Sequence, residues 1–140
     1  MSFRYFEGVA MAEAAFEAEG KDIKELFESC ADAFIDTSAD PKTIKPEIKK
    51  EIAVKGDDLE KLLFNFLEEL VFIKDSEAIV FNKATINDIS ETELKATLTG
   101  EKIKVNSEQE LRADVKAITM HMFKVEKTNK GWKATVIMDI

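Results

Sequence analysis

Residues 22–37 read DIKELFESCADAFIDT and contain the clearest helical pattern in the first half of the chain. Asp22 belongs to the residue types that favour a helix N-cap, and Glu25, three positions later, completes a capping-box pattern. The predicted helix ends near Asp40, because a residue that precedes proline avoids the α-region. Its apolar residues recur at helical spacing and form one stripe, which consists of Ile23, Leu26, Phe27, Cys30, Ala31, Phe34 and Ile35.

A second helix is predicted after Gly56, where Asp57 and Glu60 repeat the capping-box pattern. Its apolar stripe is widened by Phe64 and Phe72, so we expect this helix to be covered on more than one side. The stripe itself consists of Leu59, Leu62, Leu63, Phe66, Leu67, Leu70 and Val71.

The rest of the chain alternates apolar and polar residues with a period of two, which is typical of β-strands. Residues 1–19 are predicted to be extended, and a short strand over residues 48–54 follows a loop over residues 41–46. A polar connection is expected over residues 100–113, and Thr128-Asn129-Lys130-Gly131 resembles a hairpin turn. In the second half of the chain, five strands are predicted over residues 79–81, 84–89, 94–98, 115–125 and 132–140.

The order of these elements is strand, helix, strand, helix and then a run of strands, without internal repeats or a linker. This order is typical of the α+β class. We therefore expect a single domain over residues 1–140, with a largely antiparallel β-sheet and two amphipathic helices packed on it.

The composition excludes several classes of function. The 140 residues include 20 lysines and arginines against 28 aspartates and glutamates, for a formal net charge of −8. This charge disfavours a polyanion-binding surface built from bulk charge, so direct RNA contact would need a local basic patch and no DNA binding is expected. One cysteine and one histidine are too few for an internal disulfide, a cysteine-cluster zinc site or a polyhistidine site. The N-terminus has no apolar signal region and no run reaches membrane-spanning length, so we expect a cytoplasmic protein without membrane contact.

Two groups of lysines are candidates for RNA contact. Neither group alternates with aromatic residues as a base-stacking surface does, so we interpret both as solvated faces. The first group is Lys42, Lys45, Lys49 and Lys50, and the second is Lys124, Lys127, Lys130 and Lys133.

Common catalytic motifs are missing, including a glycine-rich phosphate loop and a Gly-x-Ser-x-Gly elbow. No nucleophile–base pair is apparent, which disfavours a free-standing hydrolase. Cys30 lies on the apolar stripe of the first helix and is predicted to be a buried small hydrophobe. His121 is interpreted as a structural histidine, with a ligand or proton carrier as the alternative. Lys116 either faces solvent or pairs with a carboxylate.

Asp139 interrupts the apolar pattern of the last strand next to the C-terminal residue Ile140. Its side chain and the terminal carboxylate of Ile140 would form a compact group of hard oxygen donors, which with one more carboxylate could hold Ca²⁺ or Mg²⁺. Glu13 is the third donor suggested by strand parity, because it points away from Phe16. Spacing alone favours the simpler interpretation, an exposed polar residue at the end of a strand.

Several strings resemble the archease family. The most specific is the ending, in which residues 115–121 read VKAITMH and residues 131–140 read GWKATVIMDI. Archeases have a similar Val-Lys-Ala-(Val/Ile)-Thr-Tyr-His strand, a hairpin, and a Gly-Trp ending that closes on Leu-Asp-Ile. Residues 56–70 and residues 20–28 add further similarity, so the resemblance covers nearly the whole chain.

The resemblance implies an activator of RtcB-type RNA ligases, which join RNA ends in tRNA splicing. Such an activator promotes formation of the guanylylated ligase with GTP and metal, and it is not itself an enzyme. The implied partner is the ligase, with only indirect association with tRNA. The implied cofactor is a divalent metal ion, with Ca²⁺ as the expected ion, held by Glu13, Asp139 and Ile140. Lys116 and His121 are the other implied functional residues.

One departure from the family pattern concerns the N-terminal half of this site. The family usually reads His-Thr-Ala-Asp, whereas this chain reads Ala10-Met11-Ala12-Glu13, so the histidine is missing and the carboxylate is one methylene longer. Carboxylate chemistry is retained, and a hard cation is still expected. The alternative is a chaperone-like binding module for RNA-processing proteins that holds no metal.

Overall fold

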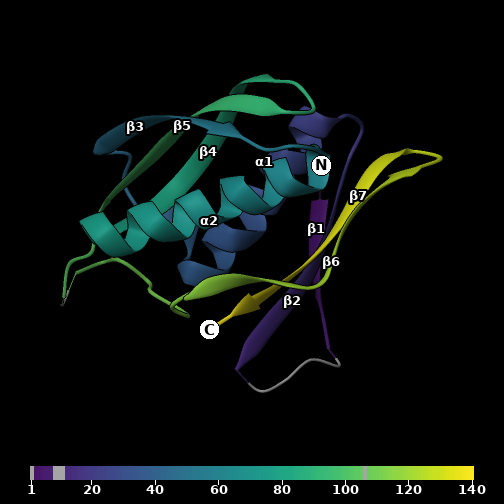
Figure 1. Cartoon of the computed structure of the whole chain (residues 1–140). Coiled ribbons are helices and arrows are strands. Elements are labelled where there is room, and N and C mark those ends of the chain that lie inside the picture. Colours follow the sequence, from purple (N-terminus) through teal and green to yellow (C-terminus); the bar gives the residue numbers. More distant parts are fainter. Residues whose placement is uncertain (1, 8–11, 106) are drawn as a thin grey trace.

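The computed structural model describes residues 2–7, 12–105 and 107–140 and confirms the α+β class (Figure 1). The predicted extended stretch appears as two strands, although residues 1 and 8–11 lie outside the described residues. The elements, in chain order, are β1 (Ser2–Phe6), β2 (Glu13–Gly20), α1 (Ile23–Ser38), a 3₁₀ turn (Pro41–Thr43), β3 (Ile48–Lys55), α2 (Leu59–Glu77), β4 (Ile79–Ile89), β5 (Glu93–Lys102), β6 (Ala117–Thr128) and β7 (Gly131–Asp139).

The strands form two antiparallel sheets rather than the one expected sheet. A four-stranded sheet has the order β1-β2-β7-β6, and a three-stranded sheet has the order β3-β5-β4. Both helices lie between the two sheets, with α1 against β2 and β4 and α2 against β6 and β3 (Figure 1). This arrangement follows from the wide apolar surface of α2, which a single sheet on one side would leave partly exposed to water.

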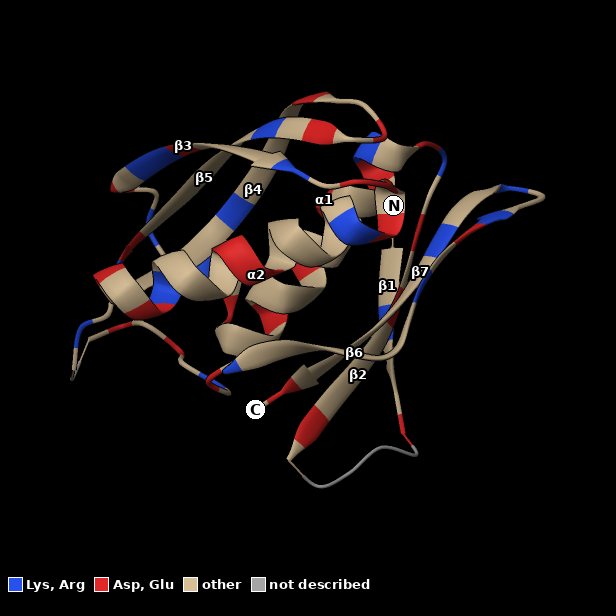
Figure 2. Cartoon of the chain, in the orientation of Figure 1, with Lys and Arg blue, Asp and Glu red and all other residues tan. Residues whose placement is uncertain are grey.

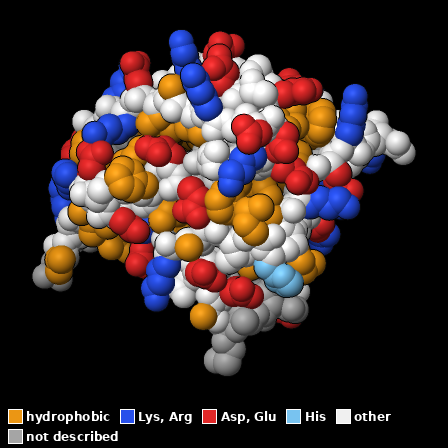
Figure 3. All heavy atoms as spheres, in the orientation of Figure 1, with side chains coloured by type: hydrophobic (Ala, Val, Ile, Leu, Met, Phe, Trp, Pro, Cys, Tyr) orange, Lys and Arg blue, Asp and Glu red, His pale blue; other side chains and the backbone are white. Residues whose placement is uncertain are grey.

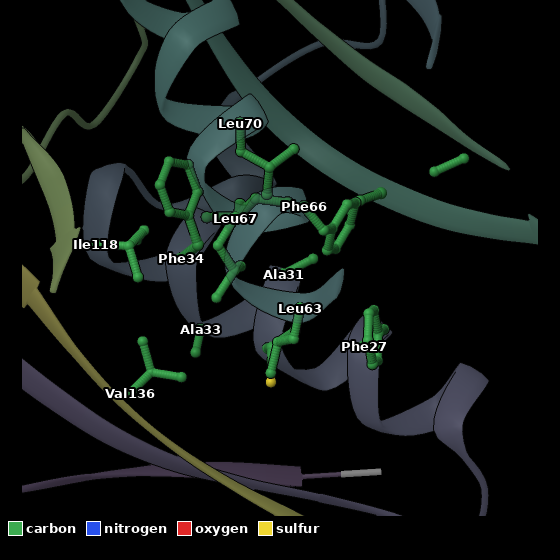
Figure 4. Close-up of a cluster of buried hydrophobic side chains, with 14 of the residues drawn as sticks. Phe27, Ala31, Ala33, Phe34, Leu63, Phe66, Leu67, Leu70, Ile118 and Val136 are labelled. Atoms are coloured by element: carbon green, nitrogen blue, oxygen red, sulfur yellow. The ribbon is translucent and has the colours of Figure 1, made fainter. Parts of the chain in front are cut away.

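The core lies between the helices and the inner faces of the two sheets. Figure 4 shows Ile118 of β6 and Val136 of β7 pointing toward the helices, where Phe34 and Leu67 are fully buried. Cys30 is also fully buried in this core, as predicted. No helix among the described residues has the length and apolar character needed to cross a membrane.

Both long helices begin at aspartate caps. The Asp22 side chain accepts a hydrogen bond from the backbone N–H of Glu25 at 2.8 Å, as predicted for α1. The cap of α2 was predicted one residue too early, because Asp58 rather than Asp57 accepts the bond, from Lys61 N–H at 2.8 Å. Glu60 does not complete a capping box: its carboxylate accepts the backbone N–H of Val125 in β6 at 2.9 Å.

Several strand boundaries differ from the sequence prediction. Residues 79–89 form one strand, β4, with a bulge between Phe81 and Lys83, so the second half of the chain has four strands among the described residues and not five. β6 begins at Ala117 rather than at Val115. The predicted hairpin turn between β6 and β7 is confirmed, and Gly131 in this turn has a φ of 139°, which side chains larger than hydrogen rarely tolerate.

The connection between β5 and β6 is tied to both helices. Backbone N–H groups of Arg112 and Ala113 bond to the last carbonyls of α1, and the ammonium of Lys74 in α2 bonds to Asp114 at 2.6 Å. Lys74 also bonds to Asp75 at 2.5 Å, and its side chain is only 6% exposed. Burial opposes the charged form, but the bonds to the two aspartates outweigh it and raise the pKa of Lys74, so the lysine is charged at neutral pH.

Replacing Phe66 by alanine should lower the free energy of unfolding by about 3–5 kcal/mol, because the fully buried ring packs between α2 and α1 against Phe27. Urea denaturation measures the change. The matched control is Phe72→Ala on the same helix, where the side chain is 64% exposed and the expected change is within about 0.5 kcal/mol. Equal losses in the two variants would contradict the placement of α2 between the sheets.

Replacing Lys74 by methionine should release Asp114 and loosen the entry into β6. The amide of Lys116, which bonds to the carbonyl of Asp139 at 2.8 Å, should then exchange with solvent roughly five- to tenfold faster. Hydrogen exchange followed by NMR measures this rate. The Val125 amide, held by Glu60, serves as an internal reference, and Lys95→Met at an exposed position controls for loss of charge. An unchanged Lys116 rate in Lys74→Met would show that the ion pair does not hold this segment.

Candidate functional site

The pairing of β2 with β7 places two of the predicted site residues directly opposite each other. Glu13, the first residue of β2, and Asp139, the last residue of β7, are Cα partners in the antiparallel register. In Figure 2 both strand ends are acidic and lie at the same end of the four-stranded sheet, close to the C-terminus. Because directly opposed residues share one face of a sheet, the two carboxylates belong to one surface.

This surface is the outer face of the four-stranded sheet. Ala14 and Met138, the neighbours of the two acidic residues, pack in or against the core between sheet and helices, so Glu13 and Asp139 point the other way. Both residues are nevertheless only partly exposed. Ala15 and Ile137, two positions further along this outer face, are buried although they are outside the main core. The carboxylates therefore border a buried apolar patch, beside which electrostatic interactions are stronger than in bulk water.

Backbone hydrogen bonds bring two further predicted residues next to this pair. The N–H of Lys116 donates to the carbonyl of Asp139 at 2.8 Å, and the N–H of Ile140 donates to the carbonyl of Ala12 at 2.9 Å. Lys116 is exposed, which supports the interpretation that its side chain faces solvent. The cationic residue and the C-terminal residue are thus fixed at the same end of the sheet as the two carboxylates. The preceding residues of the motif, Ala10 and Met11, lie outside the described residues.

His121 does not join this group through the strand register. It lies in a bulge of β6 between Thr119 and Lys124, where no residue pairs with β7, and it is exposed. His121 therefore lies outside the core, and its interpretation as a structural histidine, with a ligand or proton carrier as the alternative, stays a prediction. The alternation of the sequence could not show this exposure, because a bulge breaks the period of two.

Thr119 is a residue of this face that the sequence analysis did not single out. It is the Cα partner of Ile137, two pairs beyond the pairing of Ala117 with Asp139. Among the buried side-chain nitrogen and oxygen atoms of the described residues, only its Oγ1 has no hydrogen-bond partner. Such atoms are uncommon in folded proteins and often accompany functional sites. A threonine within a β-rich string gives no sequence signal of this kind.

The donor chemistry of the site suits a hard cation. Glu13 and Asp139 supply carboxylate oxygens, which are the ligands that hard divalent cations prefer. Within the described part of the chain, however, no three or more histidine, cysteine, aspartate or glutamate side chains come together in a way that could hold a metal. The two side chains would need further ligands, such as water, to complete the coordination of an ion.

Cys30 offers no alternative reactive centre. The thiol is fully buried in the core, and burial, with a smaller contribution from Asp32, raises its pKa, so the nucleophilic thiolate is disfavoured. The arrangement of Glu13 and Asp139 can bind a cation or a cationic group, and it can present Lys116 to an anion.

Comparisons with known proteins agree with the resemblance. Residues 3–140 match the Archease protein family (MTH1598/TM1083). Protein archease of Pyrococcus abyssi is 38% identical over 134 residues, which cover 92% of this chain and 93% of the relative. Protein archease of Methanosarcina mazei is 33% identical over 142 residues, which cover 99% of this chain and 95% of the relative.

Solved structures share the fold. The solution structure of protein 1598 of Methanobacterium thermoautotrophicum superposes with a TM-score of 0.80 at 33% identity, covering 99% of this chain and 98% of that one. The crystal structure of an archease, possible chaperone, from Thermotoga maritima superposes with a TM-score of 0.70 at 20% identity, covering 96% and 97%. The match over nearly all residues, at this identity and with this fold, shows that the chain belongs to the archease family.

Proposed function

We propose that this archease is an activator of an RtcB-type tRNA-splicing RNA ligase, which promotes guanylylation of the ligase and multiple turnover without joining RNA itself. The observation that carries the proposal is the opposition of Glu13 and Asp139 across β2 and β7, with Lys116 bonded to the backbone of Asp139. The family resemblance implies that these residues belong to the functional site. Their meeting in space, far apart in sequence, supports a shared role.

In this proposal Glu13, Asp139 and Ile140 hold a divalent cation, with Ca²⁺ as the expected ion. When bound, such a cation supplies positive charge that can stabilise phosphoryl oxygens. The half-buried carboxylates orient donors toward one side of the sheet, and the exposed Lys116 is free to reach a phosphate of the partner's nucleotide. The protein thus presents charges of both signs from one rigid sheet end.

The charge of the chain fits a protein partner better than direct RNA binding. The net charge of −8 repels nucleic acid but favours encounter with a basic, RNA-binding ligase. Several lysines of the two groups also face acidic neighbours, for example Lys50 with Glu77 at 2.5 Å and Lys133 with Glu17 at 3.4 Å. These pairs support the interpretation of both groups as solvated faces.

A second candidate function is a chaperone-like binding module for RNA-processing proteins that holds no metal. Two observations favour it: the described residues contain no group of three metal-ligating side chains, and the N-terminal motif departs from the family pattern at Glu13. Both candidates involve a protein partner, and they differ in whether the carboxylates hold an ion.

Glu13→Gln and Asp139→Asn should each reduce stimulation of the ligase by at least about tenfold, because each removes one charged donor from the site. The measurement is RNA ligation under multiple turnover, with limiting ligase from the same source and GTP. The control is Glu19→Gln, at the far end of β2 on the same face, which should stimulate normally. Wild-type protein that fails to stimulate a competent ligase would refute the function, whereas normal stimulation by both site variants would refute the site.

Calorimetric titration with Ca²⁺ should give heat beyond dilution for the wild type and for Glu19→Gln, and much less for Asp139→Asn. Asp139→Asn removes one of the two opposed carboxylates that would bind the ion. Glu19→Gln leaves both of them in place, because Glu19 lies opposite Lys133 at the other end of the strand. Heat of dilution alone for the wild type would exclude the Ca²⁺ site and leave the metal-free module as the better description.

A further inference from the structure

A large bulge interrupts β6 beside the candidate site. The register passes from Thr119 opposite Ile137 to Lys124 opposite Thr135, so five steps along β6 correspond to two along β7. The two bulges of β4 each insert one residue, whereas this one inserts three. Within it Met122 has a φ of 57°, in the left-handed region that residues with a side chain seldom adopt. Such backbone strain persists only where the surroundings impose it, and it is concentrated at functional sites.

The bulge exposes two large apolar side chains around the single histidine. Met120 is 61% exposed and Met122 is 58% exposed, and His121 between them is also exposed. In Figure 3 the histidine lies on the visible surface with hydrophobic and acidic side chains nearby. Methionine is flexible and polarisable, so it fits irregular apolar pockets and is common at binding surfaces. Two exposed methionines on one strained loop are therefore unlike the isolated exposed apolar residues found on most proteins.

Helix α2 holds the bulge at its C-terminal end. The carboxylate of Glu60 accepts a hydrogen bond from the N–H of Val125, and the ring of Phe123 packs edge-on against Phe64 at 5.6 Å between centroids. The exposed tip thus projects from a fixed base, and a partner that binds it loses little free energy to ordering of the loop.

The bulge is continuous with the carboxylate site. Lys116 and Thr119 precede it in the same segment, and Ala117 pairs with Asp139. Val136 is the β7 residue that lies opposite the bulge. It is three positions from Asp139, which corresponds to about 10 Å along a strand. One partner surface can therefore contact the methionines and the charged residues together.

We propose that the bulge over residues 120–122 is the docking element for the protein partner, with Met120 and Met122 entering an apolar pocket of that partner. The pocket would be bordered by basic groups that face Glu13 and Asp139, because those carboxylates lie near the bulge on the same sheet and the chain has a net charge of −8. Methionine thioethers do not bind phosphate groups, so the exposed methionines favour a protein partner over a nucleic acid. The identity of the partner as the RNA ligase rests on the proposed function.

The test is a double variant, Met120→Ser with Met122→Ser, assayed for binding to immobilised ligase by biolayer interferometry. We expect affinity at least about tenfold weaker than wild type, as for the loss of central apolar anchors. Phe72→Ser, at a similarly exposed position of α2, is the matched control and should bind normally. Met120→Leu with Met122→Leu keeps the apolar volume and should retain most of the affinity. Because both methionines are exposed, the thermal midpoint of the serine variant should stay near that of wild type.

Ligation kinetics separate docking from the carboxylate site. The serine variant should need at least about tenfold more protein for half-maximal stimulation but reach the wild-type maximum, whereas Asp139→Asn should lower the maximum. The serine variant should also give the wild-type Ca²⁺ titration.

Two results would overturn the docking proposal while leaving the proposed function intact. One is wild-type affinity of the serine variant for a ligase that the wild type stimulates. The other is sedimentation showing that the methionines join two copies of this chain, with a dimeric wild type and a monomeric variant. Wild-type protein that neither binds nor stimulates the ligase would overturn both proposals.

Discussion

Helix α2 is buried between two antiparallel sheets, and the rest of the structure is arranged around that burial. Its apolar surface is too wide for one sheet, since Leu63, Phe66 and Leu67 are all fully buried. The four-stranded and three-stranded sheets together cover the two helices, and the helix also reaches past the core to β6. There Glu60 accepts a hydrogen bond from a backbone N–H of β6, the strand at the edge of its sheet, which would otherwise be open to pairing with another chain. Helix α2 therefore contributes to the core and also holds the edge strand β6 in place.

This constraint determines where function can be located. The inner face of the four-stranded sheet is occupied by core residues such as Phe16 and Val136, so polar groups of the same strands must lie on the outer face or at the ends. Glu13 and Asp139 satisfy both conditions, because strand parity turns them outward and the register ends with them. The candidate site is thus a consequence of how the sheet terminates, and it needs no cavity of its own.

The sequence predicted the parts of the structure that follow from local periodicity and capping. The stripe of α1, its Asp22 cap, the burial of Cys30 and the final hairpin were all predictable for this reason. The division into two sheets was not, because strand pairing depends on contacts distant in sequence. The meeting of Glu13 and Asp139 was anticipated by parity and by the family resemblance, but neither could give the register that makes them direct partners. The exposure of His121 was missed because the bulge changes parity without a local signal.

Three departures from regular structure occur together in β6, and their common position is informative. Sequences that specify a fold tend to satisfy local and global preferences together, and the exceptions fall at functional or strained sites. Here the left-handed Met122, the three-residue bulge and the unpartnered hydroxyl of Thr119 all lie in β6, beside the pair of carboxylates. A regular strand in which the hydroxyl of Thr119 had a hydrogen-bond partner would bury the core residue Ile118 equally well, with less strain. The irregular end of β6 is therefore better explained by what the outer surface has to contact than by what the core requires.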